Sequence, residues 1–340
     1  MRWQTQELYF RQLLAARFPT LPMLGKIFFA CPAGSSTSLF QEWLESEMDV
    51  PAELLFYGNS AVKEAHNACT GYRNDAVVVM PGRYNTEGDL TWSKQSTHLL
   101  GMGQATRGYY GSGGDVTIRN LAATDAAYGM LMTGSYNQVH GIHFNNFGEN
   151  AACVSALKEQ GRSNFYFGCL FGGMTRSQQA GAAAACCLWV DTSVVAAGHG
   201  MLLDGCFVGH SGGYTRSNNN TLLLFGATGA VSAGCDVTLR NTLFNTRSKV
   251  AGCSAIKFAA NYTVDRMFLI DNCVFYNFYD ENDITSTLTE VINDDCGTTH
   301  KILVKDSHQT GWASWEATRS TVYLTQAGAS GASGIATVET

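Results

Sequence analysis

Charged residues are scarce in this chain of 340 residues, where Asp, Glu, Lys and Arg together make up only 15%. Disordered chains are rich in charge and poor in apolar residues, so a hydrophobic content of 45% excludes extensive disorder. The sequence also lacks a basic run, and its formal net charge is −6, which argues against a nucleic-acid partner because phosphate contacts need clustered Lys and Arg. No stretch is apolar enough to suggest a membrane span. We therefore expect a folded protein with neither nucleic-acid nor membrane partners.

Cysteine is plentiful, but the spacing that metal sites need is missing. The chain has 11 cysteines and no Cys-x-x-Cys pair with partner ligands, which disfavours a zinc site. The alternative is that these cysteines are small buried hydrophobic residues in a chain that folds in a reducing compartment. The N-terminus also lacks the apolar segment of a signal peptide. We expect no metal or cofactor, and synthesis in the cytoplasm without general export.

What the sequence does contain is a short alternating strand that recurs between Asp115 and Trp312. Each copy runs into a small or polar residue, and these anchor residues are Asn120, Gly141, Gly168, Gly205, Asn241, Asn272 and Asp306. The steps between them are 21, 27, 37, 36, 31 and 34 residues. A period in this range, with strands and no helical pattern, is typical of a solenoid.

The residues around the anchors predict how the coils stack. The residue two positions before each anchor is apolar. The residue one position after it is often small, and the residue three positions after it is mostly aromatic. Parallel strands stack at ~4.8 Å, so like positions should form continuous columns. Gly and Asn at the anchor fit a sharp turn, because both tolerate the left-handed backbone conformation. The predicted fold class is all-β, a single-stranded right-handed parallel β-helix with an N-terminal cap of helices and strands. The aromatic column comprises Phe144, Phe171, Val208, Phe244 and Phe275.

The chain divides by pattern into four parts: an N-terminal helical anchor segment (1–24), a cap (25–75), the β-helix (76–312), and a C-terminal strand with a Gly/Ala/Ser-rich tail (313–340). Residues 4–18 carry apolar side chains at helical spacing, and prolines end the segment. One interpretation is a helix packed on the open end of the solenoid. The other is an adaptor that docks the chain onto something larger. The predicted anchoring residues are Phe10, Leu13, Leu14 and Phe18.

A family resemblance appears where the predicted solenoid begins. The run Ala76-Val-Val-Val-Met-Pro-Gly-Arg-Tyr, then Leu90-Thr-Trp, then His98-Leu-Leu-Gly-Met-Gly resembles the first coils of pectate-lyase-like right-handed β-helix proteins. A helix expected over residues 60–69 occupies the place of the capping helix in that family. The resemblance implies fold more than function, because this fold holds lyases, hydrolases, epimerases and bacteriophage tailspikes.

Two carboxylates lie one residue before the anchors, where a catalytic pair could form. Asp204 and Asp271 are two coils apart, hence ~9.6 Å by strand spacing, and this distance alone is permissive for a glycosidase pair. However, Arg240 and Lys305 alternate with them in the same column. An opposite charge one coil away lowers a carboxyl pKa, the wrong direction for a general acid. We favour a solvated charge ladder over an active site.

Other candidate sites are weaker. Gly198-His-Gly and Asn293-Asp-Asp resemble elements of polygalacturonase-like hydrolases, but in reversed order. The acids of residues 280–295, including Asp294 and Asp295, could hold calcium, although no basic partner is evident. The tyrosines at 109–110 and 276–279 could stack on sugar rings, or equally lie in the core or at a subunit contact.

A short N-terminal helix ahead of a capped β-helix resembles the plan of bacteriophage tailspike and capsid-decoration proteins, which are typically homotrimers. The resemblance implies a non-enzymatic virion structural protein whose helix binds other virion proteins and whose flank forms the trimer, with apolar columns that a neighbour covers. The alternative is a tailspike depolymerase that hydrolyses or lyases a host surface glycan, with Asp204, Asp271, Asp294 and Asp295 as the candidate carboxylates. The expected localisation is the virion.

Overall fold

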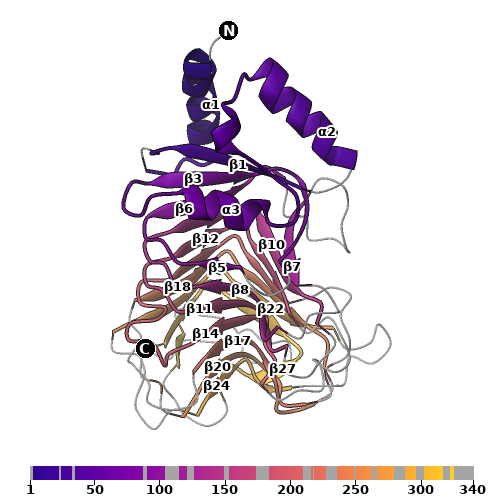
Figure 1. The fold of residues 1–340 in the computed structure, drawn as a ribbon. Helices are drawn as coiled ribbons and strands as arrows, with labels where there is room; N and C mark the ends of the chain where they lie inside the picture. The colour runs from indigo at the N-terminus through magenta and orange to yellow at the C-terminus, as the bar shows by residue number, and fades with distance from the viewer. Residues whose placement is uncertain are drawn as a thin grey trace.

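The computed structural model describes residues 3–22, 24–32, 35–86, 90–103, 115–120, 126–148, 153–173, 184–209, 216, 218–226, 236–248, 250–260, 262, 266–278, 288–295, 302–316 and 322–324. The chain winds into a right-handed parallel β-helix, as the sequence predicts. Its strands stack along one axis, with the N-terminal helices at one end (Figure 1). Each full coil contributes one strand to each of three parallel sheets, which we call A, B and C.

Sheet A has 11 strands, and all its pairings are parallel. It continues past the first full coil through two strands of the cap, so the cap adds to the sheet instead of standing apart. In order, its strands are β2 (Leu55–Tyr57), β1 (Ile27–Cys31), β3 (Asp75–Val79), β6 (Thr97–Gly101), β9 (Gln138–His140), β12 (Phe165–Phe167), β15 (Leu202–Asp204), β18 (Val237–Arg240), β21 (Phe268–Asp271), β25 (Ile302–Lys305) and β28 (Val322–Leu324).

Sheet B has eight strands and carries the aromatic column. Phe144 pairs with Phe171, and Phe244 with Phe275, with ring centroids 5.6 Å and 4.6 Å apart. The predicted aromatic stack is therefore present inside the solenoid. The strands of sheet B are β4 (Gly82–Asn85), β7 (Val116–Asn120), β10 (Ile142–Asn146), β13 (Leu170–Gly172), β16 (Phe207–Gly209), β19 (Leu243–Thr246), β22 (Val274–Asn277) and β26 (His308–Thr310).

Sheet C has seven strands and closes each coil. A separate two-stranded sheet pairs β23 (Leu288–Glu290) with β27 (Trp312–Ser314) near the C-terminal end. The strands of sheet C are β5 (Thr91–Trp92), β8 (Tyr128–Met132), β11 (Ser155–Glu159), β14 (Leu188–Val190), β17 (Thr221–Phe225), β20 (Ser254–Phe258) and β24 (Ile292–Asp294).

Six of the seven anchor residues form a sharp turn, as expected, and this turn joins sheets A and B. Gly141, Gly168 and Gly205 have φ of 61°, 57° and 63°, and Asn241 and Asn272 have φ of 52° and 51°. These left-handed values are costly for most side chains, which explains the restriction to Gly, Asn and Asp. The Asn272 Nδ2 also donates to the Asn241 Oδ1 at 2.8 Å, so stacked asparagines share amide hydrogen bonds.

The first copy of the predicted repeat is wrong. Asn120 was aligned with Gly141, but its strand β7 belongs to sheet B, where Asn120 pairs with Asn146. The strand that precedes β9 in sheet A is β6. The cause is that a strand of sheet B and a strand of sheet A have almost the same sequence: Val116-Thr-Ile-Arg-Asn and Val237-Thr-Leu-Arg-Asn.

Helices cover the N-terminal end of the solenoid. The longest is α1 (Trp3–Arg17), followed by α2 (Ser35–Glu42), which runs into a π-helical turn (Trp43–Glu47), then a 3₁₀ turn (Ala52–Leu54) and α3 (Ala61–Ala68). Besides the core inside the solenoid, a second hydrophobic cluster forms between α1 and the outer side of β1, β3 and β6. This cluster covers the outer face of the first strands of sheet A, whose edge strand is β2. No helix in the described part of the chain is long and apolar enough to cross a membrane.

Candidate functional site

The outer column of sheet A brings the two candidate carboxylates into register with basic residues. Asp204 pairs with Arg240, and Arg240 with Asp271. The Arg240 Nη2 lies 2.5 Å from the Asp204 Oδ2, and the Asn241 Nδ2 donates to the Asp204 Oδ1 at 2.8 Å. Partial burial opposes ionisation of Asp204, but these hydrogen bonds outweigh it and hold the pKa of the carboxyl below its ordinary value. Asp204 is therefore a stable carboxylate and a poor proton donor.

Asp271 has its own cation on the next coil. It pairs with Lys305 across β21 and β25, and the Lys305 Nζ lies 3.5 Å from the Asp271 Oδ1. The Arg240 guanidinium, whose pKa is raised chiefly by its hydrogen bond to Asp204, also feels the charge of Asp271. The four residues thus form the charge ladder that the sequence favoured over an acid–base pair.

The other two candidate carboxylates do not converge. Asp294 lies in register with the core residue Phe258 and is only 2% exposed. Its neighbour Asp295 forms an ion pair with Lys257, at 3.0 Å, and its side chain is 47% exposed. The two adjacent acids therefore occupy different environments. The acids at 280, 281 and 283 lie outside the described residues, and no three His, Cys, Asp or Glu side chains of the described part gather as a metal site would require.

The Gly-His-Gly and Asn-Asp-Asp elements are not brought together. Gly198 and His199 lie in the turn after β14, whereas Asn293 lies on β24, and β17 and β20 separate these strands in sheet C. The His199 carbonyl accepts a hydrogen bond from the Ser163 backbone N–H at 2.6 Å, which is a turn contact between coils. The resemblance of these elements to a hydrolase is not supported by their positions.

One ionisable group with an unusual environment was missed by the sequence. Glu159 ends β11 and is fully buried inside the solenoid. It accepts hydrogen bonds from the Tyr166 hydroxyl, from the Asn164 Nδ2 at 3.0 Å and from the Gly161 N–H at 2.5 Å. Burial raises the pKa of Glu159 to about 7, although the hydrogen bonds oppose the shift. Because no solvent reaches it, this carboxyl is placed to stabilise the fold rather than to meet a substrate.

Aromatic side chains do lie on the outside. On sheet C, the Lys158 ammonium sits 4.0 Å from the Trp189 ring centroid and 5.7 Å from that of Tyr128, and it forms an ion pair with Asp191 at 2.7 Å. On sheet B, Tyr276 is 44% exposed and stacks on Phe278. The tyrosines at 109, 110 and 279 lie outside the described residues.

The predicted anchoring residues occupy two faces of α1. Phe10 and Leu14 are buried against the cap, where the Phe10 ring centroid lies 5.2 Å from that of Phe29, and Phe18 is buried on the ring of His140. Leu13 points away and is 46% exposed. Two further large apolar side chains of α1, each 61% exposed, were not singled out by the sequence: Leu8 and Tyr9.

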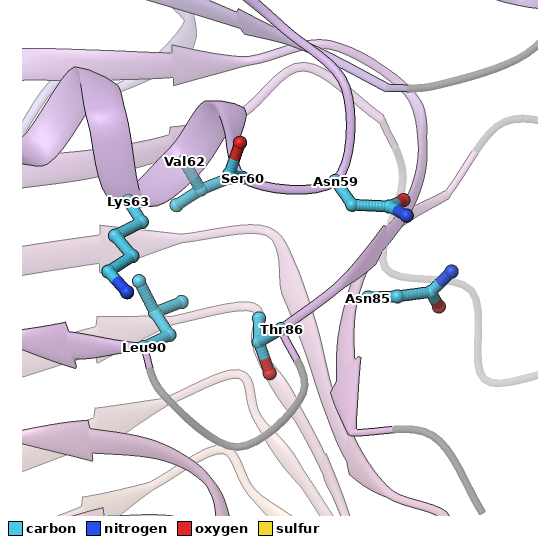
Figure 2. Close-up of a pocket in the computed structure, with 7 residues that line it drawn as sticks. All are labelled: Asn59, Ser60, Val62, Lys63, Asn85, Thr86 and Leu90. Atoms are coloured by element: carbon cyan, nitrogen blue, oxygen red, sulfur yellow. The ribbon is translucent and has the colours of Figure 1, made fainter. Parts of the chain in front are cut away.

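Two hollows lie at this end of the molecule. The larger, about 580 Å³, is mostly apolar and lies between α1 and the segment that follows it; its lining comprises Arg11, Gln12, Ala15, Leu21, Pro22 and Leu24. The smaller, about 210 Å³, lies between the start of α3 and β4 (Figure 2). Its polar groups are largely engaged within the chain, since the Asn85 Oδ1 accepts from Arg119 at 2.9 Å and the Thr86 hydroxyl contacts the Gly129 carbonyl at 3.0 Å.

Comparison with known proteins supports the fold alone. No protein-family model and no curated protein matches the chain. Among solved structures, the pectate lyase Pel9A is similar with a TM-score of 0.51, at 14% identity over 85% of this chain and 64% of its own. A pectin methylesterase from Aspergillus niger has a TM-score of 0.44, at 16% identity over 89% of this chain and 85% of its own. ORF18 of Geobacillus virus E2 has a TM-score of 0.35, at 12% identity over 76% of this chain and 58% of its own. At these identities the shared property is the parallel β-helix.

Proposed function

We propose that this chain is a non-enzymatic structural protein of a bacteriophage particle, a homotrimeric β-helix that attaches to other virion proteins on the capsid or the tail through α1. The observation that carries the proposal is the exposed side of α1, where Tyr9 and Leu13 lie one turn apart and Leu8 adjoins Tyr9 in the sequence. Apolar clusters at the end of a folded domain mark protein contacts. We call these three residues the α1 outer face.

The inner face of the same helix holds α1 to the rest of the chain. Phe10 and Leu14 fasten α1 to the second hydrophobic cluster. Arg11 fastens it again, because its guanidinium donates to the Leu24 carbonyl at 2.8 Å and the Gly25 carbonyl at 2.5 Å. A partner bound to the α1 outer face would thus be held to the solenoid by a rigid helix. The neighbouring apolar hollow of about 580 Å³ offers room for a side chain of that partner.

The outward carboxylates support the non-enzymatic part of the proposal. Asp204, Asp271 and Asp295 each have a basic partner, while Asp294 is buried. A glycosidase needs one carboxyl with a raised pKa on the surface that meets the sugar. The pKa of Asp204 is held below its ordinary value by its hydrogen bonds, which is the opposite direction.

The test is attachment of the full chain to particles, followed by immunogold electron microscopy. The variant Leu8→Gln/Tyr9→Gln/Leu13→Gln changes only exposed side chains, and we expect it to lose at least ten-fold in particle-bound protein. The matched control is Val194→Gln/Val195→Gln, which removes two exposed apolar side chains from the turn after β14. Equal attachment of the two variants would overturn the role of α1, and absence of the unmodified chain from particles would overturn the virion assignment.

A tailspike depolymerase that cleaves host surface glycan is the second candidate. The exposed stack of Tyr276 on Phe278 favours it, since sugar rings bind such surfaces. Release of reducing ends from a host polysaccharide, abolished by Asp204→Asn/Asp271→Asn, would support this candidate over the non-enzymatic one.

A further inference from the structure

One stretch of the cap carries most of the net charge of this chain. Residues 27–62 contain five of the 28 acids and none of the 22 Lys and Arg residues, so the rest of the chain is nearly neutral, with 23 acids against 22 bases. All five carboxylates are exposed, and none of them forms an ion pair within the part of the chain that the structure describes. We call this set the cap carboxylates: Glu42, Glu45, Glu47, Asp49 and Glu53.

Three of the cap carboxylates are held in place by the packing of the helix that carries them. Glu42 ends α2, and Glu45 and Glu47 lie on the π-helical turn that continues it. Leu44 of this turn is fully buried in the second hydrophobic cluster. The Tyr57 hydroxyl donates to the Glu45 Oε1 at 2.8 Å. The charges therefore have fixed positions at the surface of the cap.

The strip of α1 that borders this turn carries two exposed apolar side chains. Gln6, Tyr9 and Leu13 follow one another at helical spacing along the strip. The Gln6 Nε2 donates to the Glu47 carbonyl at 2.8 Å, so this side of α1 lies against the π-helical turn. Tyr9 is 61% exposed and Leu13 is 46% exposed. Apolar area and negative charge thus lie side by side.

The helix α2 repeats this combination. Leu39 is 70% exposed, and Glu42 follows it by three residues, which places both side chains on one side of the helix. The two helices lie together at the N-terminal end of the solenoid (Figure 1). Arg11, the cation in the middle of α1, pairs with Glu7 at 2.6 Å and so does not offset the cap carboxylates. We call the resulting area the cap surface: Tyr9, Leu13, Leu39, Glu42 and Glu47.

We propose that the cap surface binds a protein that presents Lys and Arg side chains around an apolar patch. Its apolar side chains gain from being covered, but its carboxylates lose water at the same time and have no base of their own chain to compensate. A partner with cations beside its apolar patch supplies that compensation. A nucleic acid would bring phosphates, which the same carboxylates repel. The inference rests on the proposed function, because it gives the chemistry of the virion protein that α1 contacts.

The experiment measures binding of the full chain to two designed helical peptides by fluorescence anisotropy. Both peptides carry Leu along one face, and the residues that flank this face are Lys in one peptide and Glu in the other. We expect the Lys peptide to bind roughly ten-fold more tightly than the Glu peptide at low salt. The difference should shrink in 1 M NaCl, where the Debye length is about 3 Å.

A pair of matched variants locates the binding on the chain. Glu42→Gln/Glu47→Gln removes two charges and keeps the size of both side chains, and it should weaken binding of the Lys peptide about five-fold. The control Asp236→Asn/Asp306→Asn makes the same change in net charge at two other exposed acids, each of which has a basic partner. The control should bind the Lys peptide as the unmodified chain does. Circular dichroism of each variant checks that the β-helix persists.

Equal affinity for the two peptides, or an equal loss in Glu42→Gln/Glu47→Gln and in the control, would overturn the inference. Labelling of particles separates this failure from that of the proposed function. If Glu42→Gln/Glu47→Gln labels particles as well as the unmodified chain does, the basic partner is wrong and attachment through α1 stands. If the Lys peptide binds as expected but the chain is absent from particles, the virion assignment is wrong and the cap surface still selects a basic partner.

Discussion

On the outer side of sheet A, one row of paired residues runs along the solenoid and ends in the charge ladder from Asp204 to Lys305. We call this row the outer file. Its charge and its exposure change along its length. Its first part, Leu100, His140 and Phe167, is uncharged, and the N-terminal segment packs on it through Phe18. From Asp204 to Lys305 the same file alternates in charge and is partly open to solvent. The strand spacing is common to both parts, so the difference lies in what covers them.

Burial decides which polar residues each part can hold. In the covered part, the imidazoles of His98 and His140 are buried, and the His98 Nδ1 accepts the Gln138 N–H at 3.1 Å. Desolvation disfavours the imidazolium form, so these side chains serve as neutral polar groups. In the open part, water screens and solvates each charge, and ion pairs form at little cost. The comparison predicts that acid will act on the covered part first.

The largest expected effect is therefore acid destabilisation of the covered end. Burial lowers the pKa of His66 and His140 to about 3 and that of His98 to about 4. Below the ordinary value of 6.5, the unfolded chain gains protons that the folded chain excludes, so stability falls as pH falls from 6.5 toward 4. Each histidine contributes about 1.4 kcal/mol per pH unit in this window. Urea unfolding at pH 6.5 and 4.5 should show a loss of several kcal/mol.

Hydrogen exchange can localise that loss. At pH 4.5, α1, β6 and β9 should lose protection before β18, β21 and β25, because the pKa of Asp204 is lowered and its ion pair persists to more acidic pH. The variant His98→Gln/His140→Gln should flatten the dependence while keeping an uncharged polar side chain at both positions. Earlier loss of protection at the charge ladder would contradict the comparison.

Glu159 should produce a slope of opposite sign and smaller size. Its pKa is raised to about 7, so the folded chain holds a proton that the unfolded chain has lost above 4.5. This contribution to stability is complete below pH 4.5 and is lost as pH rises through 7, by roughly 3 kcal/mol in total. In Glu159→Gln the group cannot ionise, so the stability of the unmodified chain relative to that of the variant should fall as pH rises from 5 to 8.

Two results would settle the role of Glu159. If urea midpoints of Glu159→Gln and the unmodified chain move in parallel across this range, Glu159 does not titrate with folding. Tyr166→Phe provides the second comparison, because it removes one donor to the carboxyl and should raise its pKa further.

The sequence predicted the solenoid because a parallel β-helix turns sequence columns into spatial ones. Once Gly141, Gly205 and Asn272 were aligned, the register of sheets A and B followed, and so did the ion pairs of the ladder. The alignment went wrong at Asn120 because strands of sheets A and B can share the same letters. The residues of such a strand do not identify its sheet, and only the turn before the strand does.

The features that could not be predicted from the sequence depend on which way a side chain points, and not on which residues pair between strands. Nothing in the sequence singles out Glu159, and its inward orientation is shown only by its hydrogen bonds with Tyr166 and Asn164. Leu13 follows the same helical spacing as Phe10 and Leu14, but a helix with apolar residues on two faces cannot be divided from its pattern alone. The structure makes that division by packing one face on the cap.

The smallest expected effect comes from the open part of the file. The side chains of Arg240 and Asp204 are 46% and 18% exposed, so Arg240→Gln should cost a single copy less than about 1 kcal/mol. The matched control is Lys257→Gln, which breaks the more exposed pair with Asp295 on sheet C. Both should be measured by urea unfolding at one protein concentration, and a loss from Arg240→Gln well above that from Lys257→Gln would contradict the comparison.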